Sequence, residues 1–300
     1  MGFRNIHFII NPVAGNGKSP LTKEYLEQYF INSFHHLSVK YSTHKKHAIK
    51  LAKTSIAEGA DIIVACGGDG TVNEVASSLV GTSIPLGIIP IGSGNGLASN
   101  LCIPKNLRRA LELIKNSHTV RIDVGRINDK YFFSNTGIGF DASVIKNYES
   151  SEGRTLKGYL MACLRTFRQL KQSGDIQICI NDLNILTDPF MIFASNSNEM
   201  GYKLSLTPKA SLKDGLLDVL IISKIGRFKM LLLGFLMILN KSHLMKEVKS
   251  FQTKSLVLIN QGGNSLHSQI DGELHKVPNG RISIQIEEHE LEVIVPENLI

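Results

Sequence analysis

The sequence predicts two domains, an α/β domain with a parallel sheet followed by a mainly antiparallel β domain. Up to Lys115, short apolar runs alternate with segments of helical period, which is the order typical of a parallel sheet. From Thr119 onward most segments are short, β-rich and separated by turns. The chain has 300 residues, 43% of them hydrophobic, which suffices for two modest cores. We place the domains at 1–120 and 121–300, and leave open whether the C-terminal tail returns to the first domain.

The first domain is expected to follow a βαβαβ order. Its central strand, Ile62–Cys66, is an apolar run without helical period, which fits a strand buried on both faces of a parallel sheet. The other expected elements are a strand at Ile6–Ile10, a helix at Leu21–Phe34, a strand at Leu37–Thr43, a helix at His47–Glu58, a helix that opens at Thr71, a strand at Ile84–Ile91, a short helix after Gly96 and a helix at Leu107–Lys115.

The second domain is expected to consist of strands with two helical insertions. Basic residues occur along or beside both helices, which are expected at Arg154–Lys171 and Arg227–Leu239. The expected strands are Val120–Ile127, Tyr131–Asn135, Ile176–Ile180, Phe190–Ser195, Leu216–Ser223, Leu256–Ile259, Ile282–Ile286 and Leu291–Val295.

A glycine-rich turn follows the central strand at Gly67-Gly68-Asp69-Gly70-Thr71. Glycines let the backbone turn tightly and approach a ligand closely. The free N–H groups and the positive dipole end of the following helix favour phosphate, so a nucleotide site is predicted here. The alternative is an ordinary tight turn, which would not require the carboxylate of Asp69 between glycines.

Two further glycine loops follow the first expected strand, Ile6–Ile10, and the strand expected after the central one, Ile84–Ile91. The stretch Asn11–Lys18 ends like a P-loop, but Pro12 stands where that motif needs its first glycine, so we reject a Walker A site. The stretch Gly92–Gly96 does not match the dinucleotide-binding motif GxGxxG, because Leu97 occupies the position of the last glycine. In an open α/β sheet, ligands bind beyond the carboxyl ends of the strands, where these three loops would meet.

The composition of the chain limits the classes of binding partner and the cellular setting that are expected. The net charge of +7 and the pI near 9.1 favour anionic partners, and nucleic acid is the weakest of them because no basic, aromatic-rich motif is present. The four cysteines are far apart, which indicates reduced thiols in a cytoplasmic setting. The longest apolar run, Met230–Leu239, is much shorter than the roughly 20 residues that a membrane span needs, so a soluble protein is expected.

Several motifs occur in one order along nearly the whole chain. They are Asn11-Pro12…Gly15, Gly67-Gly68-Asp69-Gly70-Thr71-Val72-Asn73-Glu74-Val75, Gly92-Ser93-Gly94-Asn95, Asn135…Gly137-Ile138-Gly139-Phe140-Asp141, Asp214-Gly215-Leu216-Leu217-Asp218 and Asp271-Gly272-Glu273. This set resembles the soluble diacylglycerol kinase-like lipid kinases, bacterial relatives of the sphingosine kinases that are more distantly related to NAD kinase. The resemblance implies an α/β nucleotide domain, a β-sandwich lipid domain, and ATP and Mg²⁺ in the cleft between them.

The resemblance also implies roles for individual residues. The metal would be held by Asp214 with backbone carbonyls near Ser211 and Leu216. Asp271 and Glu273 match the motif of the catalytic base and its supporting carboxylate, with Asp69 as the competing base. If Asp271 and Glu273 lie on one strand, their spacing of two points both side chains to one face. ATP would contact Asn11, Thr43, Gly67, Gly68, Asp69, Gly70, Thr71, Val72, Asn73 and Ser93.

The predicted function is an ATP-dependent lipid kinase that phosphorylates a hydroxyl of a diacylglycerol-like or sphingoid-like lipid. The alternatives are NAD kinase-like activity on a soluble nucleotide and a nucleotide-binding regulator without turnover. Gly96-Leu97 departs from many bacterial members of the family, which leaves the identity of the lipid open. We expect a cytoplasmic protein that docks peripherally on membranes through the basic residues of Arg154–Lys171 and those flanking Met230–Leu239. Homodimerisation is left open.

Overall fold

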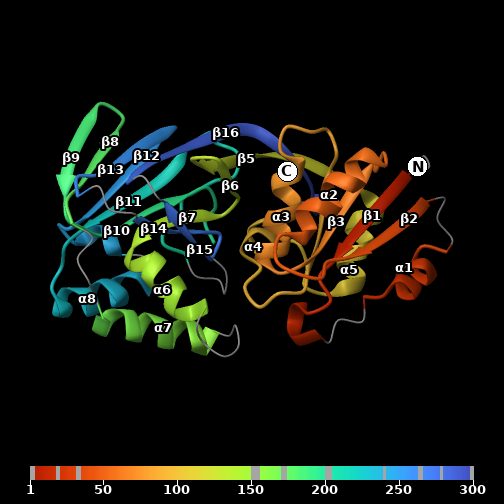
Figure 1. Ribbon diagram of the computed structural model, residues 1–300, viewed down its shortest axis with the longest axis horizontal. Helices are drawn as coiled ribbons and strands as arrows, with labels where there is room; N and C mark the ends of the chain where they lie inside the picture. The colour runs from red at the N-terminus through yellow and green to blue at the C-terminus, as the bar shows by residue number, and fades with distance from the viewer. Residues whose placement is uncertain are drawn as a thin grey trace. The chain divides into compact units, whose positions relative to one another are not determined.

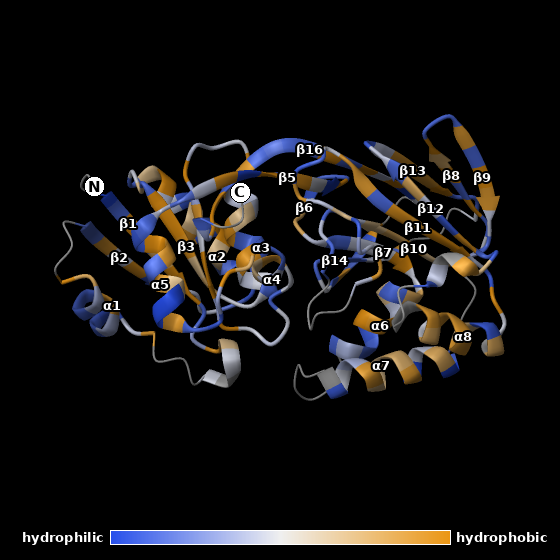
Figure 2. Ribbon diagram, turned by 180° about the vertical axis from the view of Figure 1, so that it is seen from behind, coloured by the Kyte–Doolittle hydropathy of each residue, from blue (hydrophilic) through white to orange (hydrophobic). Residues whose placement is uncertain are grey.

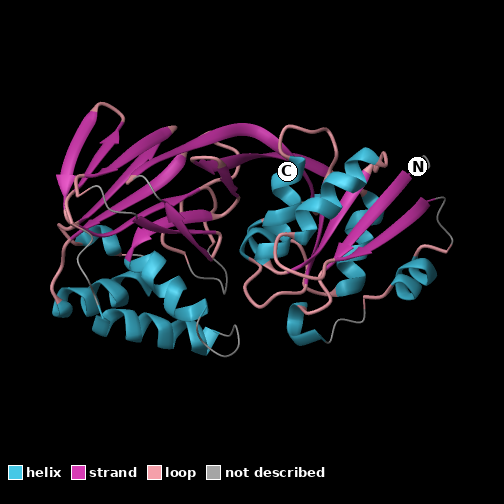
Figure 3. Ribbon diagram, viewed as in Figure 1, coloured by secondary structure: helices cyan, strands magenta, loops and turns pink. Residues whose placement is uncertain are grey.

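The computed structural model describes residues 4–17, 21–31, 35–149, 156–169, 174–199, 205–238, 241–262, 266–277 and 280–297. The chain forms two compact units, one of Met1–Ile122 with His289–Ile300 and the other of Asp123–Glu288. Figure 1 labels their helices and strands, and Figure 3 distinguishes the two kinds of element by colour. No helix in the described part of the chain is long and apolar enough to cross a membrane.

The first unit is built on a parallel sheet with strand order β2-β1-β3-β4. The end of β16 adds a parallel strand beside β4, where Val293 lies opposite Leu86. Every residue of β3 is buried, as expected for a central strand covered on both faces. The elements are β1 (Arg4–Ile10), η1 (Ala14–Gly17), α1 (Lys23–Tyr29), β2 (His35–Tyr41), α2 (His47–Ala57), β3 (Ile62–Gly67), α3 (Asp69–Leu79), β4 (Leu86–Pro90), α4 (Gly96–Asn100) and α5 (Leu107–Asn116).

The helices of this unit follow from apolar spacing and capping residues. Asn106 starts α5 by accepting a hydrogen bond from the Arg109 backbone N–H at 3.1 Å, and Leu111 and Ile114 bury the apolar side of that helix. Helices α1 and α5 share one hydrophobic core with β1 and β3. Helix α2 packs against α3 and β1, and α3 packs against β3 and β4.

The second unit is an antiparallel β-sandwich, which confirms the predicted fold class. One sheet has the order β12-β11-β10-β7-β14-β15, and the other runs from β16 through β13 and β8 to β9. Side chains of both sheets, among them Ile192 and Leu258, form the core between them. The strands are β5 (Thr119–Ile127), β6 (Lys130–Phe132), β7 (Asn135–Gly139), β8 (Ile176–Ile180), β9 (Leu183–Thr187), β10 (Pro189–Ser195), β11 (Leu217–Ser223), β12 (Val248–Thr253), β13 (Ser255–Asn260), β14 (Leu266–Ile270), β15 (Glu273–Val277) and β16 (Arg281–Ile294).

The six-stranded sheet also carries helices on its outer face. Phe193 of β10 and Ile222 of β11 point into a second core, which includes Met230 and Leu233 of α8 and, at its edge, Phe167 of α7. Strand β10 is therefore covered on both faces and is buried along its whole length. The helical elements are α6 (Phe140–Glu149), α7 (Leu156–Gln169), α8 (Arg227–Ile238) and η2 (Ser242–Leu244).

Several predicted boundaries were wrong. The stretch Tyr131–Asn135 is divided between β6 and β7, and the two last predicted strands form the single strand β16. Helix α3 begins at Asp69 rather than Thr71, because Gly68 is its N-cap. Helix α6 and strands β9, β12, β14 and β15 were not predicted. Arg154, Lys171 and Leu239, the outer ends of the two predicted basic helices, lie outside the described residues.

Candidate functional site

Three loops of the first unit start at the same edge of the parallel sheet. In register, Ile10 of β1 lies opposite Cys66 of β3, and Gly67 lies opposite Pro90 of β4, so the loops after these strands leave at one level. The Asn11 side-chain amide donates to Thr71 Oγ1 at 3.1 Å, which ties the first loop to the start of α3. The nucleotide-binding residues predicted on these loops are thus brought together.

Asp69 joins the second and third loops. Its Oδ2 accepts a hydrogen bond from the Asn95 backbone N–H at 2.8 Å, and its Oδ1 accepts one from the Gly96 N–H at 2.7 Å. As the first residue of α3, Asp69 also places a negative charge at the positive end of that helix dipole. Both carboxylate oxygens are therefore engaged in holding the loops together.

Gly68 and Gly92 bring the backbones of two loops into contact. A Cβ added to Gly92 would lie 2.5 Å from Gly68 Cα, and one added to Gly68 would lie 3.3 Å from Gly92 Cα. Side chains are excluded at this point, so a ligand that binds there can approach the main chain of both loops closely. This arrangement suits phosphate better than an apolar ligand.

We expect Gly68→Ala to weaken ATP binding about tenfold while the protein stays folded. Gly68 has φ −93 and ψ −173, which alanine adopts without strain, so the added methyl group acts through its tight contact with Gly92. Overpacking of that size separates the two loops and costs on the order of 1–3 kcal/mol. Titration calorimetry with ATP and thermal unfolding measure the two effects.

Gly226→Ala is the matched control, because a Cβ there meets nothing within 4 Å. It should bind ATP as the wild type does. A folded Gly68→Ala protein with unchanged ATP affinity would mean that this loop is an ordinary turn.

The remaining predicted ATP contacts occupy different environments. Thr43 and Ser93 are exposed, and Thr43 follows Ser42, whose N–H donates to Ile10 O at 2.9 Å at the same sheet edge. Val72 is buried, and its N–H donates to Gly68 O within α3, so neither its side chain nor its amide faces a ligand. Asn73 is partly buried, and its Oδ1 accepts a hydrogen bond from the Ser77 hydroxyl at 3.4 Å.

Glu74, for which no role was predicted, connects helices α3 and α2. Its carboxylate accepts hydrogen bonds from the backbone N–H groups of Lys46 at 2.7 Å and Ala48 at 3.0 Å, at the start of α2. It satisfies N–H groups that α2 leaves unpaired. Only the position of Glu74 inside the glycine motif could have indicated this role.

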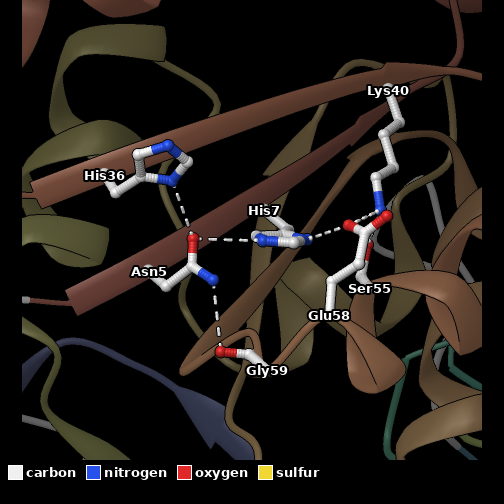
Figure 4. Close-up of polar contacts among 7 residues, drawn as sticks. All are labelled: Asn5, His7, His36, Lys40, Ser55, Glu58 and Gly59. Carbon is white, nitrogen blue, oxygen red and sulfur yellow. Dashed lines mark hydrogen bonds and ion pairs between the residues drawn. The ribbon is translucent and has the colours of Figure 1, made fainter.

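A polar cluster on β1, β2 and α2 lies apart from the loops (Figure 4). Asn5 Oδ1 lies 3.1 Å from both His7 Nε2 and His36 Nδ1, while Lys40 Nζ lies 2.6 Å from Glu58 Oε2. Burial lowers the pKa of His7, and the nearby positive charge of Lys40 lowers it further. The cluster starts near the amino end of β1, whereas the loops follow the carboxyl ends, so we interpret it as a tie between α2 and the sheet.

In the second unit, Asp271 lies in the turn between β14 and β15. Its φ of +45 and its place before β15 mean that the predicted strand geometry, with Asp271 and Glu273 on one face, was wrong. Asp271 Oδ1 accepts hydrogen bonds from the backbone N–H groups of Ser134 at 2.8 Å and Asn135 at 3.1 Å, and its Oδ2 accepts one from Phe133 at 2.9 Å. The carboxylate thus fixes the turn to the start of β7.

Gln269 connects this turn to two other motif residues. Its Nε2 donates to Asn135 Oδ1 at 2.7 Å, and its Oε1 accepts from the Gly272 N–H at 2.9 Å. It also hydrogen-bonds Asp141, whose side chain is only 4% exposed. Burial raises the pKa of Asp141 to about 6, an effect that the bond with Gln269 opposes. Asp141 Oδ2 has no hydrogen-bond partner among the described residues.

The predicted metal residues form a turn before β11. Asp214 Oδ1 accepts a hydrogen bond from the Leu216 N–H at 3.1 Å, and the buried carboxylate of Asp123 accepts one from Gly215 at 2.8 Å. Burial raises the pKa of Asp218, and the negative charge of Asp214 nearby raises it further. No group of three or more His, Cys, Asp and Glu side chains that could hold a metal occurs within the described ranges. The carboxylates of Asp214 and Asp218 are oxygen ligands of the hard type that Mg²⁺ prefers.

Comparisons with known proteins cover both units. Residues 5–127 match the family model of the diacylglycerol kinase catalytic domain, and residues 134–295 match that of the YegS C-terminal NAD kinase beta sandwich-like domain. A protein of Chromohalobacter salexigens named "Probable lipid kinase YegS-like" is 31% identical over an alignment of 216 residues, with 69% of each chain covered. A diacylglycerol kinase of Staphylococcus aureus is 27% identical over an alignment of 255 residues, with 83% of this chain and 79% of that one covered.

Solved structures resemble the whole chain. The crystal structure of a diacylglycerol kinase from Bacillus anthracis aligns with a TM-score of 0.72 at 18% identity, over 99% of this chain and 98% of that one. A second Bacillus anthracis structure, of a protein assigned to the same kinase class, aligns with a TM-score of 0.78 at 22% identity over 99% of both chains. At these identities the likeness concerns the fold.

Proposed function

The chain belongs to the family of diacylglycerol kinase-like lipid kinases, and from that premise we propose that it transfers the γ-phosphoryl group of ATP to a hydroxyl of a diacylglycerol-like lipid. The observation that carries the proposal is the joining of three loops at one sheet edge, with Asp69 bonded to the amides of Asn95 and Gly96. Phosphoryl transfer asks a protein mainly for positioning and charge neutralisation, which such loops provide.

We assign the triphosphate of ATP to the loops of the first unit. Gly68 and Gly92 present no side chain where α3 begins, so phosphate oxygens can approach the main chain there. Asn11 and Thr71 lie beside it, held by their mutual hydrogen bond. This assignment agrees with the match of residues 5–127 to a kinase catalytic domain.

Glu273 is our choice for the general base. A carboxylate whose two oxygens both accept backbone N–H groups is already engaged in fixing the local fold. Asp271 accepts three such bonds and Asp69 accepts two. Glu273 follows the turn that Asp271 fixes, opens β15 and is partly exposed, so it lies within reach of a substrate hydroxyl that approaches the turn.

Mg²⁺ is proposed at Asp214, with Asp218 as the second carboxylate. The bound ion would neutralise charge on the phosphates during transfer. Asp123 takes part indirectly, because its hydrogen bond to the Gly215 N–H holds the turn that carries Asp214. Asp123 has no exposed surface, so its role is to position that turn.

The test is an assay of the purified protein with γ-labelled ATP and Mg²⁺ against diacylglycerol, sphingosine and NAD. We expect label in diacylglycerol. Label in sphingosine alone would mean that the acceptor is a sphingoid lipid and not diacylglycerol. Label in NAD alone would overturn the lipid kinase proposal. ATP binding without transfer to any acceptor would favour the nucleotide-binding regulator.

A further inference from the structure

Helices α7 and α8 expose an unusual number of large apolar side chains. Of the thirteen large apolar residues that are exposed in the described part of the chain, seven are on these two helices. Phe228 is 83% exposed, and Phe235 is 59% exposed. We name this set the docking face: Leu160, Met161 and Leu164 on α7, and Phe228, Leu231, Leu232 and Phe235 on α8.

The docking face consists of the sides of the helices that do not pack on the protein. Met230 and Leu233 of α8 are buried in the core on the outer face of the six-stranded sheet, and Phe167 of α7 packs against the same core. The exposed residues of α8 recur with the spacing of one helix face, on the side away from Met230 and Leu233. Figure 2 shows the apolar colouring of both helices. An apolar surface of this kind marks an interaction site.

The charges around the docking face favour one kind of partner. Helix α7 exposes Lys157, Arg165 and Arg168, and neither α7 nor α8 contains an acidic residue. Lys229 of α8 forms an ion pair with Glu247, so the positive charge comes mainly from α7. A second copy of the chain would bring the same basic residues together, which repel. An anionic lipid surface instead accommodates both kinds of group, because apolar side chains contact its acyl chains and basic side chains contact its headgroups.

We propose that the docking face binds the surface of an anionic bilayer, with Phe228 and Phe235 inserted at the boundary between headgroups and acyl chains. The basic side chains of α7 lie at headgroup level. This inference rests on the proposed function in one respect, because a lipid kinase finds its substrate in a bilayer. The geometry itself comes from the exposed side chains of the second unit.

The test uses the full-length protein and sedimentation with vesicles of phosphatidylcholine, with and without phosphatidylglycerol. The variant carries Phe228→Gln and Phe235→Gln, which are exposed positions where polar substitution leaves the fold intact. We expect affinity for anionic vesicles to fall on the order of a hundredfold, since two aromatic side chains no longer leave water. Arg165→Gln with Arg168→Gln should lower it about fivefold per residue, and salt should reduce the binding of the wild type.

The matched control carries Leu183→Gln and Leu186→Gln on β9. These leucines are as exposed as the docking face but belong to the edge of the other sheet. The control should bind vesicles as the wild type does. Equal losses in both variants would mean that general surface hydrophobicity is measured, which contradicts the proposal.

Phosphorylation of a short-chain, water-soluble diacylglycerol separates docking from catalysis. The Phe228→Gln, Phe235→Gln variant should keep wild-type turnover on the soluble lipid and lose it on vesicles. Wild-type vesicle binding by this variant would overturn the proposal, and so would a change from dimer to monomer in ultracentrifugation without a change in vesicle binding. If the wild type binds vesicles but phosphorylates no lipid, the proposed function fails and the docking face stands.

Discussion

Replacing Glu273 with Gln is expected to lower lipid phosphorylation by a factor on the order of 10²–10⁴, with ATP affinity and thermal stability unchanged. Glutamine keeps the size and the hydrogen-bonding capacity of the side chain but removes the basic oxygen. Because the proton of the alcohol is taken only as the bond to phosphorus forms, the loss should occur in kcat rather than in the affinity for ATP. Single-turnover kinetics with diacylglycerol and ATP measure it.

Asp271→Asn is the informative comparison, because it alters the residue that fixes the turn. Asparagine retains one of the two oxygens that accept the N–H groups of Phe133, Ser134 and Asn135. We expect a loss of about 1–3 kcal/mol in the free energy of unfolding, together with reduced turnover. Lost turnover at unchanged stability, with full activity of Glu273→Gln, would make Asp271 the base. If both variants keep wild-type turnover while Asp69→Asn binds ATP without transfer, the base is Asp69.

Asp141→Asn is expected to change the free energy of unfolding by an amount that depends on pH. The change should be more favourable at pH 8 than at pH 3.5 by about 3 kcal/mol. Burial raises the pKa of Asp141 from 3.8 to about 6, and each pKa unit corresponds to about 1.4 kcal/mol. The residues that face Asp141 from α7 include Tyr159 and Cys163, which supply no positive charge. Asparagine is neutral at every pH and therefore avoids the cost of a buried negative charge.

The sign follows from proton binding. Between the unfolded pKa of 3.8 and the folded value of about 6, the folded protein binds more protons than the unfolded chain. The contribution of Asp141 to stability is therefore complete below pH 3.8 and is lost as the pH rises through 6. Urea unfolding of wild type and variant from pH 3.5 to 8 measures this difference. A difference that stays constant with pH would show that Asp141 has an ordinary pKa in the folded protein.

The central strands could be predicted from sequence because burial on both faces leaves continuous apolar runs. Ile62–Cys66 was predicted within one residue of β3. Ile176–Ile180 matches β8 for a different reason, because that strand alternates buried and half-buried residues. The family was recognised from motifs distributed over the whole chain, and both matching domains confirm it. The fold class therefore followed from local pattern and motif order together.

Edge strands were missed for a physical reason. Strands β9, β12 and β15 lie at the edges of the two sheets of the second unit and have mixed or polar sequences, because one side faces solvent. Strand β16 was divided in two because its middle, at Glu287–Glu290, is polar. Neither feature has the apolar period on which strand prediction depends.

The candidate site could be predicted as a set of residues but not as a set of contacts. Asp271 was expected as the base and Asp69 as the competing candidate, yet each carboxylate accepts backbone N–H groups from a distant part of the chain. Hydrogen bonds between residues far apart in sequence depend on the folded topology, which spacing alone does not contain. The same holds for the capping of α2 by Glu74.

The course of β16 affects how the chain acquires its structure during synthesis. Leu291, Val293 and Ile294 are buried in the first unit, where Val293 pairs with Leu86, although the rest of that unit ends at Ile122. A ribosome releases these residues only after the whole second unit has been made. The first unit therefore emerges first but lacks one strand of its sheet until the second unit has been translated. The order of synthesis delays the completion of the parallel sheet until the β-sandwich is present as well.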